Sequence, residues 1–455
     1  MDILENKNHS LENSTGNDTV AERNWRRFVM FRVLFNSRFY YPVIAVLFLD
    51  LGLTAAQYTL LNFAWALAIV VTDVPAGALA DRIGRKPLVV GASILMVLEM
   101  VLLGLAPRNG GMILVICCLA NRVLSGMAEG MASGADEALV FDSLAERNRS
   151  SEWPLVLDQV MRWQAVGMVI AMLVGGAVYD PVFMSRIGAP FGWHFDLSAT
   201  LRFPIYLNLL AALSALIVVL GFSEPKDRQS HAAPPAAKIS GDSKNALLLT
   251  IVEAWKWIAR TPIAIFVIVV GVTLDSVVRL FLTFSSAYFR AIALPDASYG
   301  VLGAILAGLG MIMAPVARRL AKSATVAQNY GLIIAIVLFS LIGVAFRWQY
   351  FGILFVFSLW AAIVVLSYLV SYYLNALADS QRRATVLSFK GLAFNLGYGF
   401  VSLLFAVVLR AVRDPSHSVE AFASSLWSLP VWLAGVTVIC ALSFSRYAKL
   451  LGKRI

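Results

Sequence analysis

Long apolar runs separated by short polar segments fill almost the whole sequence. A hydrocarbon core of about 30 Å takes about 20 helical residues to cross. Lipid offers no hydrogen-bond partners, so only helices or closed barrels span it, and these continuous runs are twice the length of a barrel strand. The pattern therefore predicts an all-α integral membrane protein. The twelve predicted helices lie at 33–53, 56–80, 87–106, 111–134, 161–179, 203–222, 262–287, 298–320, 328–347, 350–374, 386–410 and 425–446.

One long polar interior segment divides the runs into two sets of six. We predict an N-terminal bundle at 28–222, a linker at 223–248 and a C-terminal bundle at 249–446, with polar tails at 1–27 and 447–455. Residues 246–260 are apolar but interrupted by Glu253, Lys256 and Arg260, which predicts an amphipathic helix that lies on the membrane surface and leads into the second bundle. The segment 141–145 after the fourth run resembles 374–378 after the tenth, which indicates that the halves are related.

Composition agrees with a lipid-embedded chain. Hydrophobic residues make up 59% of the sequence and charged residues 14%, against about a quarter in soluble proteins. The net charge of +10 comes from basic residues in the short turns on the side that both termini share. By the positive-inside rule this side is cytoplasmic, so we expect a multi-pass protein of the cell membrane and no nucleic-acid partner. The three cysteines, Cys117, Cys118 and Cys440, lie inside apolar runs, and we expect no metal site and no cofactor.

The polar segment Gly77-Ala-Leu-Ala-Asp-Arg-Ile-Gly-Arg-Lys86 joins the second and third runs. Its length and charge predict a tight turn at the membrane surface. The pattern G-x-L-x-D-R-x-G-R-K resembles the loop between helices 2 and 3 of the major facilitator superfamily of secondary transporters. The resemblance extends over about residues 28–450 and implies two six-helix bundles around a central cavity that opens alternately to each side.

By the same resemblance, the turn acts as a gate. The family's acid at this position is thought to latch the cytoplasmic ends of the two halves, so Asp81 would face the start of the eleventh helix near Arg383. The three bases would hold the turn at the anionic leaflet, and we expect Asp136, Glu137 and Asp142 to pair with Arg82 or Arg85. The predicted gating residues are Gly77, Asp81, Arg82, Gly84, Arg85, Lys86 and Asp142.

Charged residues within the runs are the candidates for coupling. Arg122 lies about ten residues into the fourth run, where a cation is costly and usually functional. The stretch Arg122-Val-Leu-Ser-Gly126 resembles a helix 4 signature of antiporters in the family, whose arginine is implicated in proton coupling. The alternative is an arginine that pairs with an acid and only holds helices together. Glu129 follows one heptad later on the same face and is a plausible proton carrier, and Glu99 in the third run is a second buried acid.

Three further features leave two interpretations open. Asp275 and Arg279 stand four residues apart, so they either neutralise each other or contact substrate. Arg38 either lines the entrance of the site or extends to the interface. The stretch 167–176 resembles the glycine-rich helix 5 motif of antiporters, although Ala171 and Met172 replace the motif's glycine and proline; the alternative is plain small-residue helix packing.

The function that these features predict is secondary active transport by alternating access. We expect proton-coupled export of a small drug-like or metabolite molecule by a monomer, with protons, the substrate and the bilayer as partners. Proton-coupled uptake by symport and a non-transporting membrane receptor are the alternatives. The sequence shows no phosphate-binding loop and no catalytic motif, so we expect an ion gradient to drive the protein and do not expect an enzyme.

Overall fold

The computed structural model describes residues 20–224, 256–411 and 418–452. These residues form helices joined by short turns, with no strand among them. Twelve of the helical segments in this part of the chain are long and apolar enough to cross a membrane. The predicted all-α membrane fold is confirmed, and helices account for it because each satisfies its own backbone hydrogen bonds in lipid.

The first half starts with a broken span. A helix at 20–36 is followed by a short irregular stretch, a 3-10 turn at Tyr41–Val43 and α2, Ile44–Leu51. The helix thus begins well before the predicted start at residue 33. The rest of the half contains α3 (Ala55–Ile83), α4 (Arg85–Leu105), α5 (Gly111–Ala132), α6 (Ala135–Ala145), α7 (Trp153–Tyr179), α8 (Pro181–Gly188), α9 (Leu197–Thr200) and α10 (Phe203–Leu220).

The second half follows residues 256–260, which are helical; the remainder of the predicted linker and lead-in helix, 225–255, lies outside the described residues. Short helices α13, α18 and α20 flank the long ones at their ends. The elements are α12 (Pro262–Thr283), α13 (Ser285–Ala291), α14 (Ser298–Ser323), α15 (Val326–Ala345), α16 (Ile353–Leu377), α17 (Ser380–Ala411), α18 (Ser418–Ser425), α19 (Ser428–Phe444) and α20 (Ala448–Leu451).

The predicted tight turn at 77–86 is mostly helical, which corrects the sequence-based prediction. Helix α3 continues through this segment to Ile83, and α4 starts at Arg85. Only Gly84 makes the turn, with a φ of 103° that favours glycine. The charged residues before Gly84 do not end the helix, because they are compatible with a helix that extends beyond the bilayer into water.

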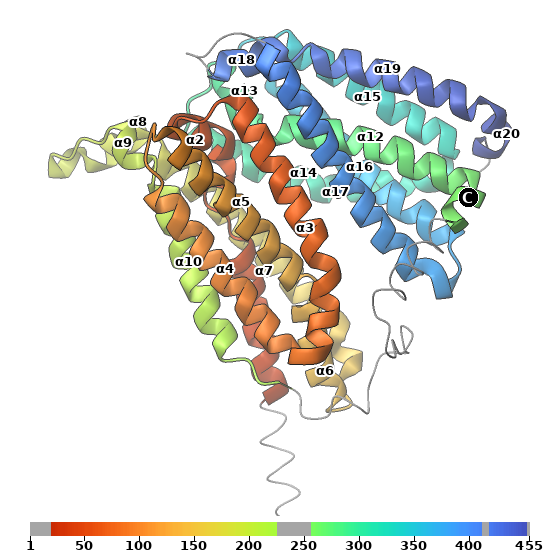
Figure 1. The fold of residues 1–455 in the computed structure, drawn as a ribbon, viewed down its shortest axis with the longest axis horizontal. Coiled ribbons are helices and arrows are strands. Elements are labelled where there is room, and N and C mark those ends of the chain that lie inside the picture. The colour runs from red at the N-terminus through yellow and green to blue at the C-terminus, as the bar shows by residue number, and fades with distance from the viewer. Residues whose placement is uncertain (1–19, 225–255, 412–417, 453–455) are drawn as a thin grey trace, which may run out of the picture.

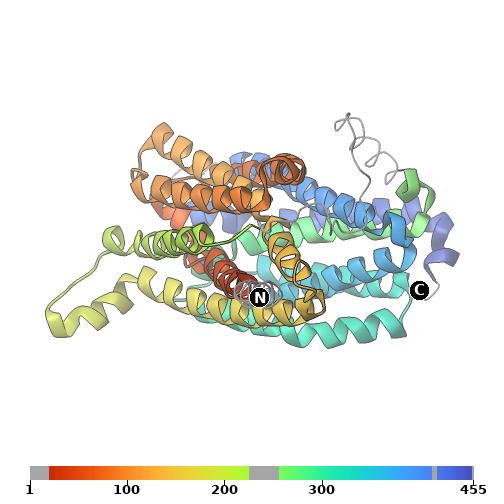
Figure 2. The same cartoon turned by 90° about the horizontal axis from the view of Figure 1, so that it is seen from below.

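The two halves lie close together at one end and diverge toward the other (Figure 1). The end that carries α2, α13 and α18 is called the α2 end, and the opposite end, next to α6, is called the α6 end. Between the halves, α3 packs along α17 and α7 packs along α14. Segment α8–α9 projects away from both bundles, as both views show (Figures 1 and 2).

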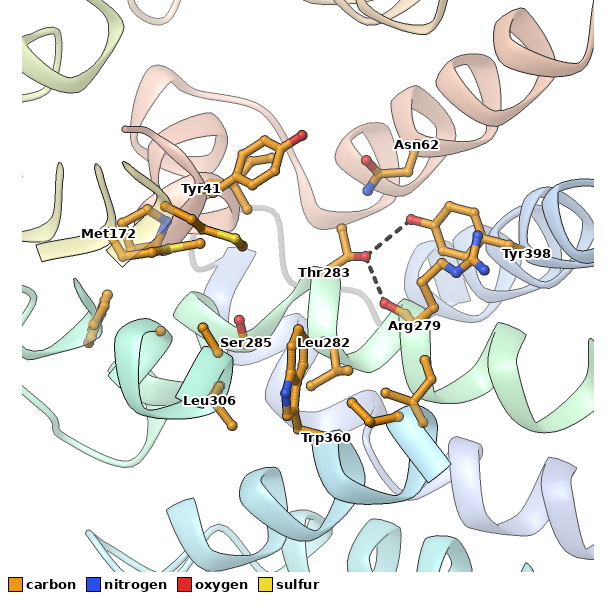
Figure 3. A pocket seen from close by; sticks show the side chains of 18 of the residues that line it. Tyr41, Asn62, Met172, Arg279, Leu282, Thr283, Ser285, Leu306, Trp360 and Tyr398 are labelled. Atoms are coloured by element: carbon orange, nitrogen blue, oxygen red, sulfur yellow. Dashed lines mark hydrogen bonds between the residues drawn. The ribbon is translucent and has the colours of Figure 1, made fainter. Parts of the chain in front are cut away.

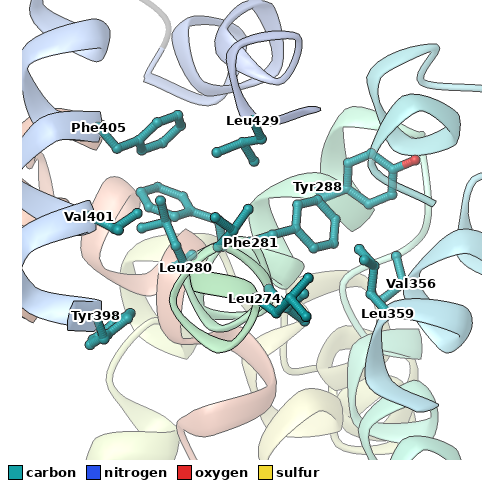
Figure 4. Close-up of a cluster of buried hydrophobic side chains, with 14 of the residues drawn as sticks. Leu274, Leu280, Phe281, Tyr288, Val356, Leu359, Tyr398, Val401, Phe405 and Leu429 are labelled. Atoms are coloured by element: carbon teal, nitrogen blue, oxygen red, sulfur yellow. The ribbon is translucent and has the colours of Figure 1, made fainter. Parts of the chain in front are cut away.

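Packing in the second half centres on α12. Leu274 and Phe281 of this helix are buried among side chains from α13, α16, α17 and α19 (Figure 4). By contrast, many large apolar side chains on the outer faces are exposed, such as Ile217 at 71% and Val431 at 70%. Exposed apolar surface of this extent is expected where lipid rather than water surrounds the helices.

Small residues let the halves approach closely where α7 crosses α14. A Cβ added at Gly176 would lie 2.6 Å from the backbone nitrogen of Gly300, and one added at Gly300 would collide with the backbone of Met172. Backbone-to-backbone contact of this kind is typical of small-residue packing between membrane helices. The 167–176 stretch therefore has a packing role at the boundary between the halves.

Candidate functional site

A cavity of about 560 Å³ lies between the two halves. Both halves contribute to its wall: Asn62 of α3 and Met172 of α7 face Arg279 and Thr283 of α12, Trp360 of α16 and Tyr398 of α17 (Figure 3). In this view Asn62, Arg279 and Tyr398 gather on one side, whereas Met172 and Leu306 lie on the other. One side of the cavity thus carries the guanidinium of Arg279 and the amide of Asn62, whereas the other carries apolar side chains beside the hydroxyl groups of Tyr41 and Ser285.

Arg122 of α5 lines this cavity and is only 5% exposed. Its Nη2 donates to Asn62 Oδ1 at 2.8 Å. The guanidinium also lies over two aromatic rings, with its Cζ 5.5 Å from the Phe48 centroid and 5.9 Å from that of Trp65. An arginine that only holds helices together would pair with an acid. No carboxylate among the described residues lies within 4.0 Å of Arg122. Its Nε also has no hydrogen-bond acceptor among these residues.

Asp275 and Arg279 neutralise each other, as their spacing predicted, while their contact with substrate stays a prediction. They form an ion pair of 2.6 Å along α12, and both line the cavity. The Arg279 fork also donates to Asn395 Oδ1 at 3.2 Å and lies over the Tyr398 ring at 5.3 Å. On the same wall Thr283 Oγ1 donates to the Arg279 carbonyl at 2.7 Å and lies 3.2 Å from the Tyr398 hydroxyl (Figure 3).

Arg38 is neither at the entrance nor at the interface, which corrects the prediction. Its Nη1 lies 2.5 Å from Glu99 Oε1, and the two side chains are 4% and 0% exposed. Asn121 adds a 2.8 Å hydrogen bond from its Nδ2 to the Glu99 carbonyl. Neither Arg38 nor Glu99 lines the cavity, because the pair is enclosed within the first half. Glu99 on α4 gives the Arg38 guanidinium a charged partner inside the bundle, in place of the water that it would contact at the membrane interface.

Glu129 lies on α5, seven residues beyond Arg122, and is half-buried. Its Oε2 is enclosed and has no hydrogen-bond partner in the part of the chain that the structure describes. Arg38, Glu99 and Arg122 are its charged neighbours, with Arg38 the strongest. A carboxylate in such surroundings can gain or lose a proton when its exposure to water changes.

At the α6 end, Arg85 ties three segments together. It forms an ion pair with Asp142 of α6, its Nη1 donates to the Ala138 carbonyl at 2.6 Å, and its backbone N–H donates to Glu224 Oε1 at 2.9 Å. The expected pairing of Asp142 with Arg82 or Arg85 thus forms with Arg85. Lys86 is half-buried beside it. The structure does not describe the side chains of Asp81, Arg82 and Arg383, nor the surroundings of Gly77.

Asp136 and Glu137 have a different partner from the one predicted. Both bind Arg32 of the helix at 20–36, at 2.7 Å from Nε to Asp136 Oδ2 and 2.5 Å from Nη2 to Glu137 Oε1. Tertiary packing brings that helix beside α6, whereas the sequence only showed that bases and acids share one side of the membrane. These pairs stay within the first half and do not join the two halves.

The α2 end carries a charged cluster that joins the two halves and that sequence reasoning missed. Arg290 Nη1 of α13 donates to both Asp50 carboxylate oxygens of α2, at 2.8 and 2.9 Å. Its Nη2 donates to Asp296 at 2.6 Å, and the Tyr179 hydroxyl of α7 donates to Asp50 at 2.5 Å. Opposite charges at corresponding ends of the two halves are the only sequence signal for this cluster.

Hydrogen bonds outside the ion pairs also join the halves at the same end. Asp180 Oδ2 accepts from the N–H of Ala297 at 3.0 Å, while its Oδ1 caps the start of α8. Ser286 Oγ accepts from the N–H groups of Ala45 and Val46 at 3.1 and 3.3 Å. The Tyr58 hydroxyl donates to the Thr283 carbonyl at 3.2 Å. Together these bonds close the cavity on the α2 side.

Solved structures of transporters share this arrangement of helices. A nucleoside transporter, NupG, has a TM-score of 0.65 at 12% identity, over 94% of this chain and 98% of that one. A bacterial homologue of the human lysosomal transporter Spinster, inward-facing and unoccupied, has a TM-score of 0.65 at 17% identity, over 96% and 97%. A D-xylose–proton symporter has 0.58 at 15%, over 92% and 97%.

Comparison at the level of sequence gives the family directly. No curated protein is significantly similar to the chain. The family model described as Major Facilitator Superfamily, however, matches residues 28–402, most of the chain. Since this match covers both halves and the twelve-helix fold with its central cavity agrees with it, the chain is an integral membrane protein that belongs to the major facilitator superfamily of secondary transporters.

Proposed function

We propose that the protein exports a small drug-like or metabolite molecule in exchange for protons, by alternating access. The observation that carries the proposal is a cavity between the halves with a dense network of inter-half bonds at one end. Its volume of about 560 Å³ falls within the usual range for small-molecule sites, about 300–1,000 Å³. In transporters of this kind the site lies near the bilayer midplane between two halves that rock around it.

The α6 end is proposed to face the cytoplasm. Arg147 and Arg149 follow α6, and Arg85 pairs with Asp142 of α6, so this end carries the basic residues that the positive-inside rule assigns to the cytoplasmic side. Both termini would then be cytoplasmic, and the described state would be the one whose outer end is closed by Asp50 and Arg290. Asp81 keeps its proposed role as a latch of the opposite, outward-open state.

Proton coupling is assigned to Glu129. Its Oε2 is enclosed and lacks a hydrogen-bond partner among the described residues, and the carboxylate lies within electrostatic range of Arg38, Glu99 and Arg122. Rocking of the halves changes the access of water to the α5 face and therefore the proton affinity of this group. The helix 4 resemblance supports antiport, whereas symport uses the same acids and remains the second candidate.

Proteoliposomes that contain pyranine test the proposal. Compounds of a small-molecule panel are added outside, and the lumenal pH is followed. Antiport moves protons out as substrate enters, so the lumen becomes more alkaline; symport makes it more acidic. Binding without any pH change or flux would identify a receptor and overturn the proposal.

The matched variants are Glu129→Gln and Glu152→Gln. Glu129→Gln should abolish the pH change while substrate binding persists, because the amide cannot carry a proton. Glu152 pairs with Arg149 three residues away at the surface, and its variant should behave as the wild type. A normal proton signal from Glu129→Gln would remove the assignment of coupling to this residue.

A further inference from the structure

We propose that the cavity binds the carboxylate of a small organic monoanion and that Arg122 is its anchor. The inference rests on the proposed function of the cavity as the transport site. It concerns the chemistry of the substrate, which neither the fold nor the family determines.

The charges on the cavity wall do not balance. Three charged residues line it: Arg122, Arg279 and Asp275. Arg279 and Asp275 neutralise each other at 2.6 Å, so one positive charge is left, on Arg122. A site with one uncompensated cation favours a ligand with one negative charge over a neutral or cationic ligand, because a low dielectric strengthens the interaction.

No acid among the described residues forms an ion pair with Arg122. Glu129 stands seven residues further along the same helix, which places it about 10 Å away along the axis. The hydroxyl groups of Tyr40, Tyr41, Tyr58 and Tyr398 near the guanidinium are uncharged at neutral pH and do not balance its charge. An isolated cation within a membrane is expensive, so the position is explained best by an anion that arrives with the substrate.

The hydrogen-bond inventory also calls for an acceptor. Arg122 is 5% exposed, and its Nε makes no hydrogen bond to any described residue, while its Nη2 is fixed by Asn62 at 2.8 Å. Across the cavity, the indole Nε1 of Trp360 is enclosed and equally unpaired among the described residues. Guanidinium and indole N–H groups only donate. A carboxylate only accepts, and it matches the planar fork of an arginine.

The remaining wall suits an apolar or aromatic body. Met172 and Leu306 form the side opposite Asn62, with Trp360 between them and Arg279 (Figure 3). Methionine adapts to ligands of different shape and packs well against aromatic rings. The substrate that fits both sides is therefore amphipathic, with a carboxylate at one end and an aromatic or aliphatic body at the other.

Matched ligand triplets separate charge from shape. Full-length protein in nanodiscs is titrated with 4-phenylbutyrate, 4-phenylbutanamide and 4-phenylbutylamine, and with indole-3-acetate, indole-3-acetamide and tryptamine, with thermal shift and calorimetry as readouts. The carboxylates should bind, with the amides and amines at least about tenfold weaker, since a charge-assisted contact is lost. Equal or stronger binding of the amides or amines would overturn the proposal, as would failure of both carboxylates to bind at millimolar concentration.

Three variants locate the effect. Arg122→Gln should lose the preference for carboxylates, and its unliganded melting temperature should not fall, because an unpaired buried charge has been removed. Arg122→Lys keeps the charge without the planar fork and should bind carboxylates with intermediate affinity. Arg162→Gln removes an arginine that is 75% exposed on the outside of α7 and should bind as the wild type. Unchanged carboxylate binding by Arg122→Gln would refute the anchor.

The outcome is independent of the transport proposal. Carboxylate binding that depends on Arg122, without any proton-coupled flux, would keep the anion site and remove the transport function. Proton-coupled flux of amines or neutral compounds through the wild type would keep the transporter and remove the anion site.

Discussion

Replacement of Asp50 by asparagine tests whether the charged cluster holds the α2 end closed. The variant keeps the size of the side chain and removes its charge. Arg290 retains Asp296, at 2.6 Å within the same half, so the guanidinium keeps an acid partner and the protein should still fold. What is lost is the ionic bond that joins α2 of the first half to α13 of the second.

The structure sets the size of the effect. Asp50 accepts two bonds from Arg290, at 2.8 and 2.9 Å, and one from Tyr179 at 2.5 Å. A hydrogen bond to a charged group contributes about 1.5–3 kcal/mol. Since the two side chains are 16% and 26% exposed, solvent screening favours the lower value, about 1.5 kcal/mol. The ratio of open to closed states at this end should therefore rise about tenfold.

Spin labels at Leu105 and Phe351 measure this ratio once the native cysteines have been replaced. These residues are 76% and 71% exposed and flank the α2 end from opposite halves. Pulsed dipolar spectroscopy should show a longer-distance population in Asp50→Asn. Asp296→Asn takes an acid from the same arginine without touching the boundary between the halves, and should shift the distribution less. An unchanged distribution in Asp50→Asn, or an equal shift in both variants, would refute the reasoning.

Three other substitutions have expected outcomes. Arg38→Met leaves Glu99 buried without its partner and should lower the free energy of unfolding by about 3–5 kcal/mol. Its control, Arg26→Met, breaks a pair whose side chains are 77% and 49% exposed and should cost at most about 1 kcal/mol. Equal losses of the two variants in chemical unfolding would contradict the burial argument. Gly176→Val places a side chain against the backbone of α14, where even a Cβ would lie 2.6 Å away. The same spin-label pair should therefore report a more open α2 end. A wild-type distance would show that the crossing of α7 and α14 accommodates a larger side chain. Asp180→Ala removes the cap of α8 and a hydrogen bond to the Ala297 N–H at the start of α14. Amide hydrogen exchange at the start of both helices should therefore quicken, by a factor equivalent to about 1 kcal/mol. Unchanged exchange rates would exclude the capping role.

Some of the site was predictable because it depends on spacing along one helix. Asp275 and Arg279 pair as their four-residue separation requires, and Glu129 follows Arg122 on the same helix. Likewise, Gly84 makes the turn between α3 and α4, although the sequence overestimated how much of 77–86 leaves the helix. These are local properties, fixed by helical geometry and backbone sterics.

Partners from different helices were not predictable in this way. Arg38 binds Glu99 from 61 residues away, and Asp50 binds Arg290 from 240 residues away. The sequence shows many acids and bases, and each has several possible partners on its side of the membrane. Which helices become neighbours selects among them, and that selection placed Asp136 beside Arg32 rather than beside Arg85.

By itself, the sequence determined that the protein is a twelve-helix membrane protein in two halves, because the length of an apolar run and the absence of hydrogen-bond partners in lipid act on each segment separately. Only the tertiary structure decided which charges are neutralised and which remain. Arg38 is paired inside the first half, while Arg122 stands on the cavity wall with no carboxylate in reach among the described residues. The reason is physical: ion pairing falls off within a few ångströms, and distances between helices are set by packing, which no single segment of the chain specifies.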